Sequence, residues 1–217
     1  MKIIDLTHEI NEEMPVYPGT DKPRLECANT YERDGFKETK IIMFSHTGTH
    51  IDPPSHIFEN GATLDSLDVA ELVGRAIAID LRALPDGAQI TMEHLSPYRD
   101  TIDGVDFLLF NLGWDKKWGT PEYFGDYPCL SNEVIDYIVN GSYKGIGFDV
   151  IGLDPVVSPT LERHKRLFSA RKIINIENLK NLDKCLGAPF TFICLPIKVK
   201  DSDGAPARAI AILDNDN

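Results

Sequence analysis

Three histidines and an aspartate fall within eleven residues of the sequence, at His46, His50, Asp52 and His56. Imidazole and carboxylate groups are ligand types that suit zinc, manganese or iron. The four positions are separated by even numbers of residues, so on an extended strand their side chains begin on one face. We therefore interpret this segment as a divalent-metal site rather than as a polar surface loop.

A straight strand could not bring these ligands to one ion. At about 3.3 Å per residue it would hold His46 and His50 about 13 Å apart, whereas ligand atoms lie about 2.0–2.2 Å from a metal. Gly48 is where the chain can bend, because glycine tolerates left-handed and bulged backbone. A helix is the rival geometry, but Gly48 weakens it and Pro53-Pro54 would stop it. The sequence thus predicts a strand that runs into a proline-braced loop.

The segment from His46 to His56, HTGTHIDPPSH, resembles the HxGTHxDxPxH signature of the metal-dependent cyclase family, which includes bacterial kynurenine formamidase and isatin hydrolase. Weaker matches run from the first expected strand to the last, so the resemblance covers nearly the whole chain. It implies a metal-dependent hydrolase that cleaves an amide bond, of the aryl formamide or cyclic amide type, with metal-activated water. A cyclase or lyase acting on a carbonyl substrate and a non-catalytic metal-binding module are the alternatives.

The resemblance also assigns roles to residues outside this segment. Family members have a histidine and, about a dozen residues later, a glutamate followed by Asn-Leu, and both are metal ligands; His164 and Glu177 are similar to that pair. By themselves, His164 would be an exposed helix residue and Glu177 an acid at a helix N-terminus. The family histidine that matches His56 is the catalytic acid/base, although the residues alone would also allow a ligand. Tyr17 occupies the place of a substrate-binding aromatic, usually tryptophan, or packs in its loop.

Five ligands exceed what one tetrahedral zinc ion requires. The resemblance to the formamidase implies a first ion on His46, His50 and Asp52, and a second on His164 with Asp52 and Glu177 as bridging carboxylates. The resemblance to isatin hydrolase implies one manganese ion instead, so the sequence leaves one or two ions open, with zinc expected and manganese the alternative. A divalent ion lowers the pKa of its bound water towards 7 and polarises a carbonyl group.

The composition excludes several partners. The formal charge of −12 over 217 residues argues against nucleic acid and anionic membranes, since both require clustered Lys and Arg. No transmembrane run or signal peptide is visible. The cysteines are far apart and are expected to be buried small hydrophobes in a reducing compartment, at Cys27, Cys129, Cys185 and Cys194. We expect a cytoplasmic enzyme with a small-molecule substrate.

The fold class predicted is α/β, with a mixed, barrel-like sheet core and peripheral helices in one domain over residues 1–217. Strands are expected over 2–6, 75–81, 106–112, 145–150, 172–176, 190–199 and 207–213, and the strand over 190–199 is expected to be interrupted by Pro196. Helices are expected over 69–73, capped by Asp65, and over 132–139, 162–168 and 178–182. Asp154 is interpreted as a turn former and Asp203-Gly204 as a hairpin turn. The resemblance implies the swivelling β/β/α architecture and a homo-oligomer, a dimer or tetramer.

Overall fold

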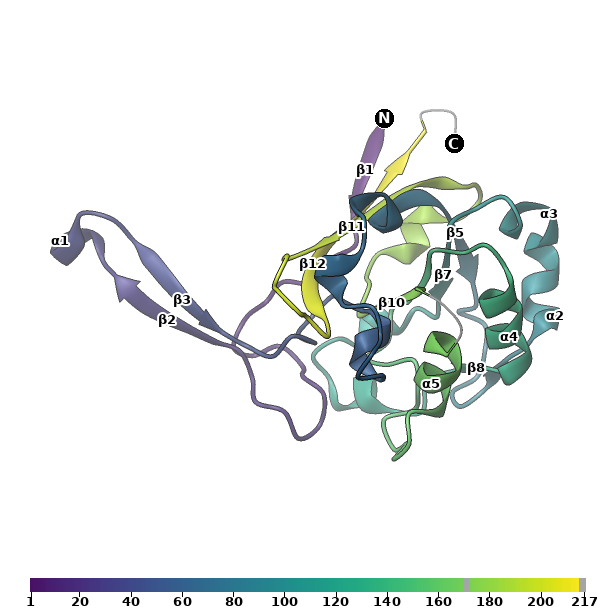
Figure 1. The fold of residues 1–217 in the computed structure, drawn as a ribbon, viewed down its shortest axis with the longest axis horizontal. Helices are drawn as coiled ribbons and strands as arrows, with labels where there is room; N and C mark the ends of the chain where they lie inside the picture. The colour runs from purple at the N-terminus through teal and green to yellow at the C-terminus, as the bar shows by residue number, and fades with distance from the viewer. Residues whose placement is uncertain (170–171, 215–217) are drawn as a thin grey trace.

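The structure is a computed structural model that describes residues 1–169 and 172–214. Its centre is a mixed sheet of eight strands (Figure 1): β1 (Lys2–Asp5), β4 (His50–Asp52), β5 (Val73–Asp80), β7 (Phe107–Asn111), β9 (Gly145–Phe148), β10 (Ile174–Glu177), β11 (Phe190–Pro196) and β12 (Ala205–Leu213). Because β12 also pairs with β4, the strands other than β1 close into a ring, and β1 continues the sheet beyond β12. The predicted barrel-like, mixed sheet is confirmed.

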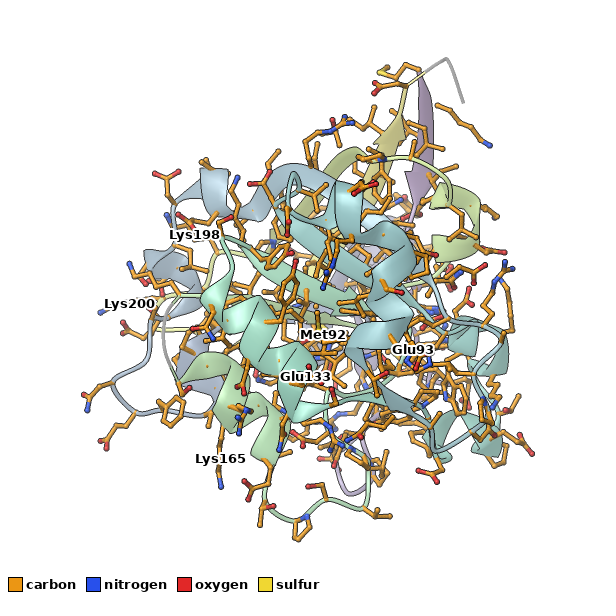
Figure 2. The ribbon with its side chains drawn as sticks, turned by 90° about the vertical axis from the view of Figure 1, so that its right-hand side faces the viewer. Met92, Glu93, Glu133, Lys165, Lys198 and Lys200 are labelled. Carbon is orange, nitrogen blue, oxygen red and sulfur yellow. The ribbon has the colours of Figure 1, made fainter. Side chains whose placement is uncertain are left out.

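Short helices cover one side of this barrel: α2 (Met92–Leu95), α3 (Arg99–Ile102), α4 (Asn132–Asn140) and α5 (Glu162–Phe168). Figure 2 faces this side, where Glu93, Glu133 and Lys165 mark α2, α4 and α5. The Ser131 side chain accepts the backbone N–H of Val134 and caps α4 as predicted. A parallel pair, β6 (Gln89–Ile90) and β8 (Cys129–Leu130), lies beside them. No helix among the described residues is long and apolar enough to span a bilayer.

Alternation along the strands produces two apolar cores. On β5, Ala76 and Ala78 belong to the inner cluster of the barrel, whereas Ile77 and Ile79 pack with the helices. The inward positions hold small residues where strands crowd together. At Gly147 an added Cβ would lie 2.8 Å from a neighbouring leucine side chain. Small side chains at these positions let a narrow barrel close around a filled interior.

The helix expected over 178–182 is wrong, and so is the helix N-terminus expected at Glu177. Strand β10 runs through Glu177, and the chain then turns through Asn178 and Asn181, whose φ angles are +56° and +59°. Asparagine tolerates this left-handed backbone. The N–H groups of Asn178 and Leu179 bond to carbonyls at the end of β9 instead of starting a helix, and a 3₁₀ turn follows at Leu182–Cys185.

Several strand ends differ from the prediction by one or two residues: β5, β9 and β12 span Val73–Asp80, Gly145–Phe148 and Ala205–Leu213 instead of 75–81, 145–150 and 207–213. The segment expected as a helix over 69–73 is a 3₁₀ turn, Val69–Leu72, and its cap is Asp68 rather than Asp65. The Asp68 carboxylate accepts the N–H of Ala70 at 2.8 Å, because it lies directly before the turn. Strand β11 ends at Pro196, where the sequence predicts an interruption, and it does not continue to residue 199, since proline has no N–H for the ladder.

Residues 24–42 form an arm that stands away from the barrel (Figure 1). It consists of β2 (Arg24–Asn29), the helical turn α1 (Tyr31–Asp34) and β3 (Glu38–Ile42), and its strands pair only with each other. Nearly all of its side chains are exposed. The chain enters and leaves the arm close to the histidine-rich segment, because residues on both sides of the arm, Thr20 and Phe44, line the same cavity as His46.

Phe192 tests the barrel interior. Its side chain is fully buried, and its ring lies 5.2 Å from that of Phe107. We expect Phe192→Ala to lower the free energy of unfolding by about 3–5 kcal/mol, because a cavity replaces the ring; urea denaturation measures this. Leu195→Ala, on the same strand but 43% exposed, is the control and should cost less than about 1 kcal/mol. Equal losses would contradict a packed barrel interior.

Candidate metal centre

The pairing of β4 with β10 places four polar side chains together. The strands are antiparallel, and their register sets Asp52 opposite Asn175 and His50 opposite Glu177. Residues directly opposite each other on one face have Cβ atoms only about 4.5–5.5 Å apart. Ile51 points into the barrel core, so its neighbours on β4 point to the other face. The polar face of this strand pair is therefore a compact, buried cluster of imidazole, carboxylate and amide groups.

The predicted bend at Gly48 is confirmed. Its φ angle is +64°, which is left-handed backbone that favours glycine. The bend returns His46 towards the strand, so that its Nδ1 lies 2.7 Å from Oδ1 of Asp52. The predicted proline brace follows as a 3₁₀ turn, Pro54–His56. One continuous segment thus brings His46 and His50 to the same carboxylate, since His50 Nε2 lies 3.2 Å from that oxygen.

His164 reaches the cluster from helix α5. Its Nε2 lies 3.3 Å from Oε1 of Glu177 and 3.7 Å from Oδ2 of Asp52. The Asp154 carboxylate fixes this side chain, because it accepts the N–H groups of Arg163 and His164 and lies 2.7 Å from His164 Nδ1. The interpretation of Asp154 as a turn former misses this role. Nothing in the spacing of Asp154 and His164, ten residues apart across a loop, reveals the contact.

Each of the three histidines directs one ring nitrogen inward and gives the other to an acceptor. His50 Nδ1 lies 2.7 Å from the backbone carbonyl two residues earlier. His164 Nδ1 faces Asp154, and His46 Nε2 lies 3.2 Å from Oδ2 of Asp203. Histidines that bind metals are typically oriented in this way, because the outer bond fixes the ring and leaves the inner lone pair free. The donor set therefore fits a metal centre.

The electrostatics of the cluster favour positive charge. Burial alone would raise the pKa of Asp52, but the imidazoles of His50 and His46 outweigh it and bring that pKa well below its usual range. Burial alone would lower the pKa of His50, but the carboxylates of Asp52 and Glu177 raise it to about 9. The carboxylates thus hold protons on the imidazoles. A divalent cation could replace those protons, which is the usual coupling of metal binding to proton release.

Among the described residues, three groups of three donors have ligand atoms that lie within 4.8 Å of one another. One of them, His46, His56 and Asp203, includes the exposed carboxylate of Asp203. The other two are His46, His50 and Asp52, and Asp52, His164 and Glu177, and they share Asp52. Asn175 supports them, because its amide donates to Oδ2 of Asp52 at 3.0 Å and to Oε1 of Glu177 at 2.8 Å. Sequence reasoning missed Asn175, although a position two residues before Glu177 on one strand shares its face.

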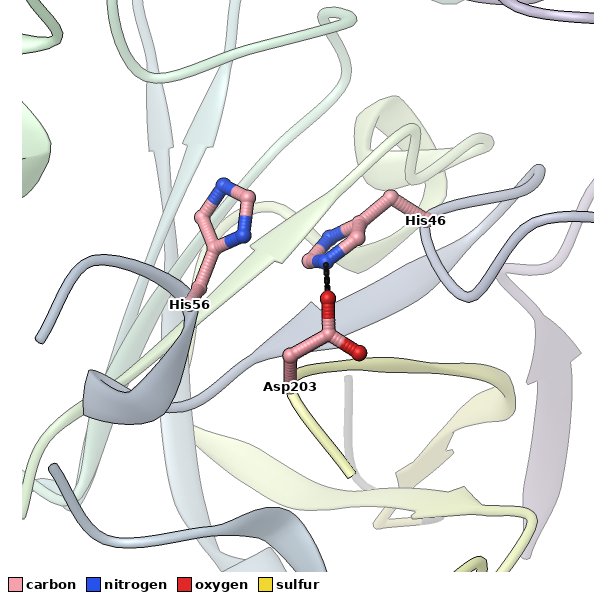
Figure 3. Close-up of side chains that lie close together, drawn as sticks. All are labelled: His46, His56 and Asp203. Atoms are coloured by element: carbon pink, nitrogen blue, oxygen red, sulfur yellow. Dashed lines mark hydrogen bonds and ion pairs between the residues drawn. The ribbon is translucent and has the colours of Figure 1, made fainter. Parts of the chain in front are cut away.

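His56 lies beside the donors rather than among the buried ones. Its ring centroid is 4.1 Å from that of His46 and 5.7 Å from that of His164. Figure 3 shows its ring facing His46, with Asp203 below both. Burial lowers the pKa of His56, which favours a neutral imidazole that can accept a proton.

A cavity of about 340 Å³ opens above the cluster. His46, His50, His56, His164 and Glu177 line its polar end, and its other walls are largely apolar and aromatic: Pro15, Val16, Tyr17, Phe44, Ile151 and Leu161. The structure thus places Tyr17 on the cavity wall, where its hydroxyl donates to the carbonyl of Val156 at 3.2 Å. A concave, apolar space with convergent polar groups at one end is the usual form of a small-molecule site.

A closed barrel with buried imidazole and carboxylate donors beneath an apolar cavity defines a protein of the metal-binding α/β class. The family model described as "Putative cyclase" matches residues 4–155, and the chain belongs to this cyclase family. It is 31% identical over 209 residues to the kynurenine formamidase of Bacillus cytotoxicus, and the matched region covers 95% of each chain.

Two solved structures are similar over almost the whole chain. Isatin hydrolase A from Labrenzia aggregata, bound to benzyl benzoate, has a TM-score of 0.84 and 26% identity and covers 97% of this chain and 93% of that one. A structure described as a potential metal-dependent hydrolase with cyclase activity has a TM-score of 0.75 and 30% identity, covering 97% and 96%. The recognition of the cyclase family from the histidine-rich segment is confirmed.

Asn175 tests how the two carboxylates are held. We expect Asn175→Leu to lower the free energy of unfolding by about 2–3 kcal/mol, since two buried charged acceptors lose their amide donor. Urea denaturation of the metal-free protein measures the change. Leucine has a similar volume and suits a buried position, so an amide that did not hold the carboxylates would give a neutral or stabilising result.

Proposed function

We propose that the protein is a metal-dependent amidohydrolase that cleaves the C–N bond of an aryl formamide or a cyclic amide. The observation that carries this proposal is the convergence of three imidazoles and two carboxylates at the foot of an apolar, aromatic cavity. A formamidase and an isatin hydrolase among the similar proteins support the same reaction class.

The roles of the ligands follow from the two groups of donors. His46, His50 and Asp52 would hold one divalent cation, and His164 would hold a second, with Asp52 and Glu177 bridging the two. We propose zinc, with manganese as the alternative ion. When bound, the cation supplies Lewis-acid activation of water and of the substrate carbonyl. Asn175 keeps the two carboxylates in register for this purpose.

His56 is proposed as the acid/base. Its ring lines the cavity beside the donors, with its centroid 4.1 Å from that of His46. As a neutral imidazole it would take a proton from the attacking water and return it to the leaving amine. Tyr17 would contact the aromatic part of the substrate, and its hydrogen bond to Val156 fixes the ring on the wall.

The finer properties of the protein are also part of the proposal. We infer a single catalytic domain over residues 1–217 that acts in the cytoplasm on a small molecule, without nucleic acid. No disulfide forms among the four cysteines, which suits a reducing compartment. Cys129, Cys185 and Cys194 are buried as expected, but the expectation is wrong for Cys27, which is exposed on the arm because both strands there face solvent.

The arm supports a homo-oligomer. Leu25 and Ile41 are paired across its two strands on one face, and they are 36% and 57% exposed. The opposite face is polar, with Glu26 and Lys40 in an ion pair at 3.5 Å. An isolated two-stranded ribbon is marginally stable in water, so its apolar face needs a cover. We propose that a second copy of this chain covers it, in a dimer or tetramer.

Substitutions on the apolar face of the arm test the proposed homo-oligomer. Leu25→Asp with Ile41→Asp would place two charges on the apolar face, and we expect the protein to become monomeric, as measured by sedimentation velocity. Glu26→Gln with Lys40→Gln, on the polar face of the same strands, is the control and should keep the oligomer. A doubly substituted arm that left the oligomer intact would refute an interface there.

Turnover of N-formylaniline tests the reaction. Dialysis against a chelator should abolish it, and zinc or manganese should restore it. We expect His56→Ala to lower kcat by about 10²–10⁴-fold with the metal content unchanged, because the acid/base is lost and the ligands are not. His94→Ala, in helix α2 where Nδ1 accepts the N–H of Thr91, is the control. Full turnover by the chelated protein would end the proposal.

A further inference from the structure

A turn far along the chain presses against His46. Asp203, in the turn before β12, lies with its Oδ2 at 3.2 Å from Nε2 of His46 (Figure 3). The same oxygen accepts the Ser45 hydroxyl at 3.3 Å. Asp203 therefore contacts the outer nitrogen of the ring, on the side away from Asp52, to which the inner nitrogen points. A hairpin-turn role, which the sequence predicts, does not account for these contacts.

The backbone of Gly204 lies directly against the same imidazole ring. An added Cβ there would lie 2.5 Å from Cε1 and 2.8 Å from Nε2 of His46. Real Cβ atoms do not approach so closely, so any side chain at position 204 would move the ring. The φ angle of Gly204 is not among the left-handed ones, so the need for glycine here is space rather than backbone conformation. The backbone of the turn packs directly against the imidazole ring of His46.

Strand β12, which follows this turn, pairs with the rest of the histidine-rich segment. In the pairing of β12 with β4, Ala205 lies opposite Ile51 and Pro206 opposite His50. The N–H of Ala207 donates to the carbonyl of Thr49 at 2.9 Å. The turn and the start of β12 thus contact the bent segment at consecutive positions, and any shift of this strand would be transmitted to His46.

We propose that Asp203 and Gly204 are positioning residues for the metal ligand His46. The Asp203 carboxylate accepts Nε2–H, which selects the tautomer whose Nδ1 lone pair points inward. Gly204 sets the plane of the ring, so that this lone pair faces Asp52. This role rests on the proposed metal centre. It means that two residues near the C-terminal end of the chain hold a ligand from its N-terminal part.

Affinity for Zn²⁺, measured on the full metal-free chain by competition with a chromophoric chelator, tests this role. We expect Asp203→Ala to weaken binding by about 10–100-fold, the usual effect of losing an outer partner of a metal ligand. Asp203→Asn keeps an acceptor oxygen and should recover most of the affinity. Asp201→Asn removes a neighbouring charge that is 76% exposed, and it should bind as the unsubstituted chain does.

The Gly204→Ala substitution is a second, separate test. It should weaken Zn²⁺ binding at least as much as Asp203→Ala, and urea denaturation shows whether the fold survives; if it does not, Asp203→Ala decides alone. Long-range ¹H–¹⁵N spectra of the His46 ring, recorded at a pH high enough for the ring to be neutral, should show the Nε2–H tautomer, and Asp203→Ala should lose that preference.

The outcomes separate the two proposals. Equal affinity of the unsubstituted chain and Asp203→Ala would overturn the positioning role and leave the metal centre intact. An unsubstituted chain that binds no divalent cation would overturn the metal centre and this inference together. Failure of N-formylaniline turnover, with the expected order of metal affinities preserved, would count against the reaction only.

Discussion

The register between β4 and β10 is the constraint on which the site depends. It places Asp52 opposite Asn175 and His50 opposite Glu177 on a face that is almost completely buried and meets solvent only at the cavity. Two buried carboxylates so close together repel each other and lose their hydration, so they require positive charge and hydrogen-bond donors nearby. The imidazoles and the amide of Asn175 supply these. A slip of one residue in this pairing would send the ligands into the barrel core and Ile51 out of it.

Closure of the barrel provides the remaining positions. β12 pairs with β1 and β11 along its length and with β4 at its start. A strand that begins at the site is therefore anchored by most of its residues elsewhere, which gives the turn at Asp203 and Gly204 a fixed place. His164 depends on a different anchor, because helix α5 packs on the outer core and Asp154 binds its first turn. The centre is thus assembled from four segments, namely the bent segment with β4, strand β10, the turn before β12 and helix α5, of which only α5 is held from outside the sheet.

Much of this arrangement can be predicted from the sequence where the cause is local. The even spacing of the histidines, the bend at Gly48 and the apolar runs of the strands are visible in the residues. The helix expected after Glu177 does not form because the backbone N–H groups there donate to the carbonyls of Phe148, at the end of β9, and of Val150, just beyond it, which are tertiary contacts. Asp154 and Asp203 escape notice for the same reason, since their partners are defined by the fold. Asn175 is the exception, because strand periodicity alone would have placed it beside Glu177.

The arm and the site share one stretch of chain, and this would link the proposed oligomer to the cavity. Strand β3 ends at Ile42, Phe44 lines the cavity while half exposed, and His46 follows two residues later. Ser45, between them, bonds to Asp203. A partner that covered the apolar face of the arm would therefore act on a short segment whose other end is the proposed metal ligand His46. The turn before β12 holds this segment at Ser45 and His46, so Phe44, which lies between the arm and these contacts and lines the cavity, is the first cavity residue that such a partner would affect.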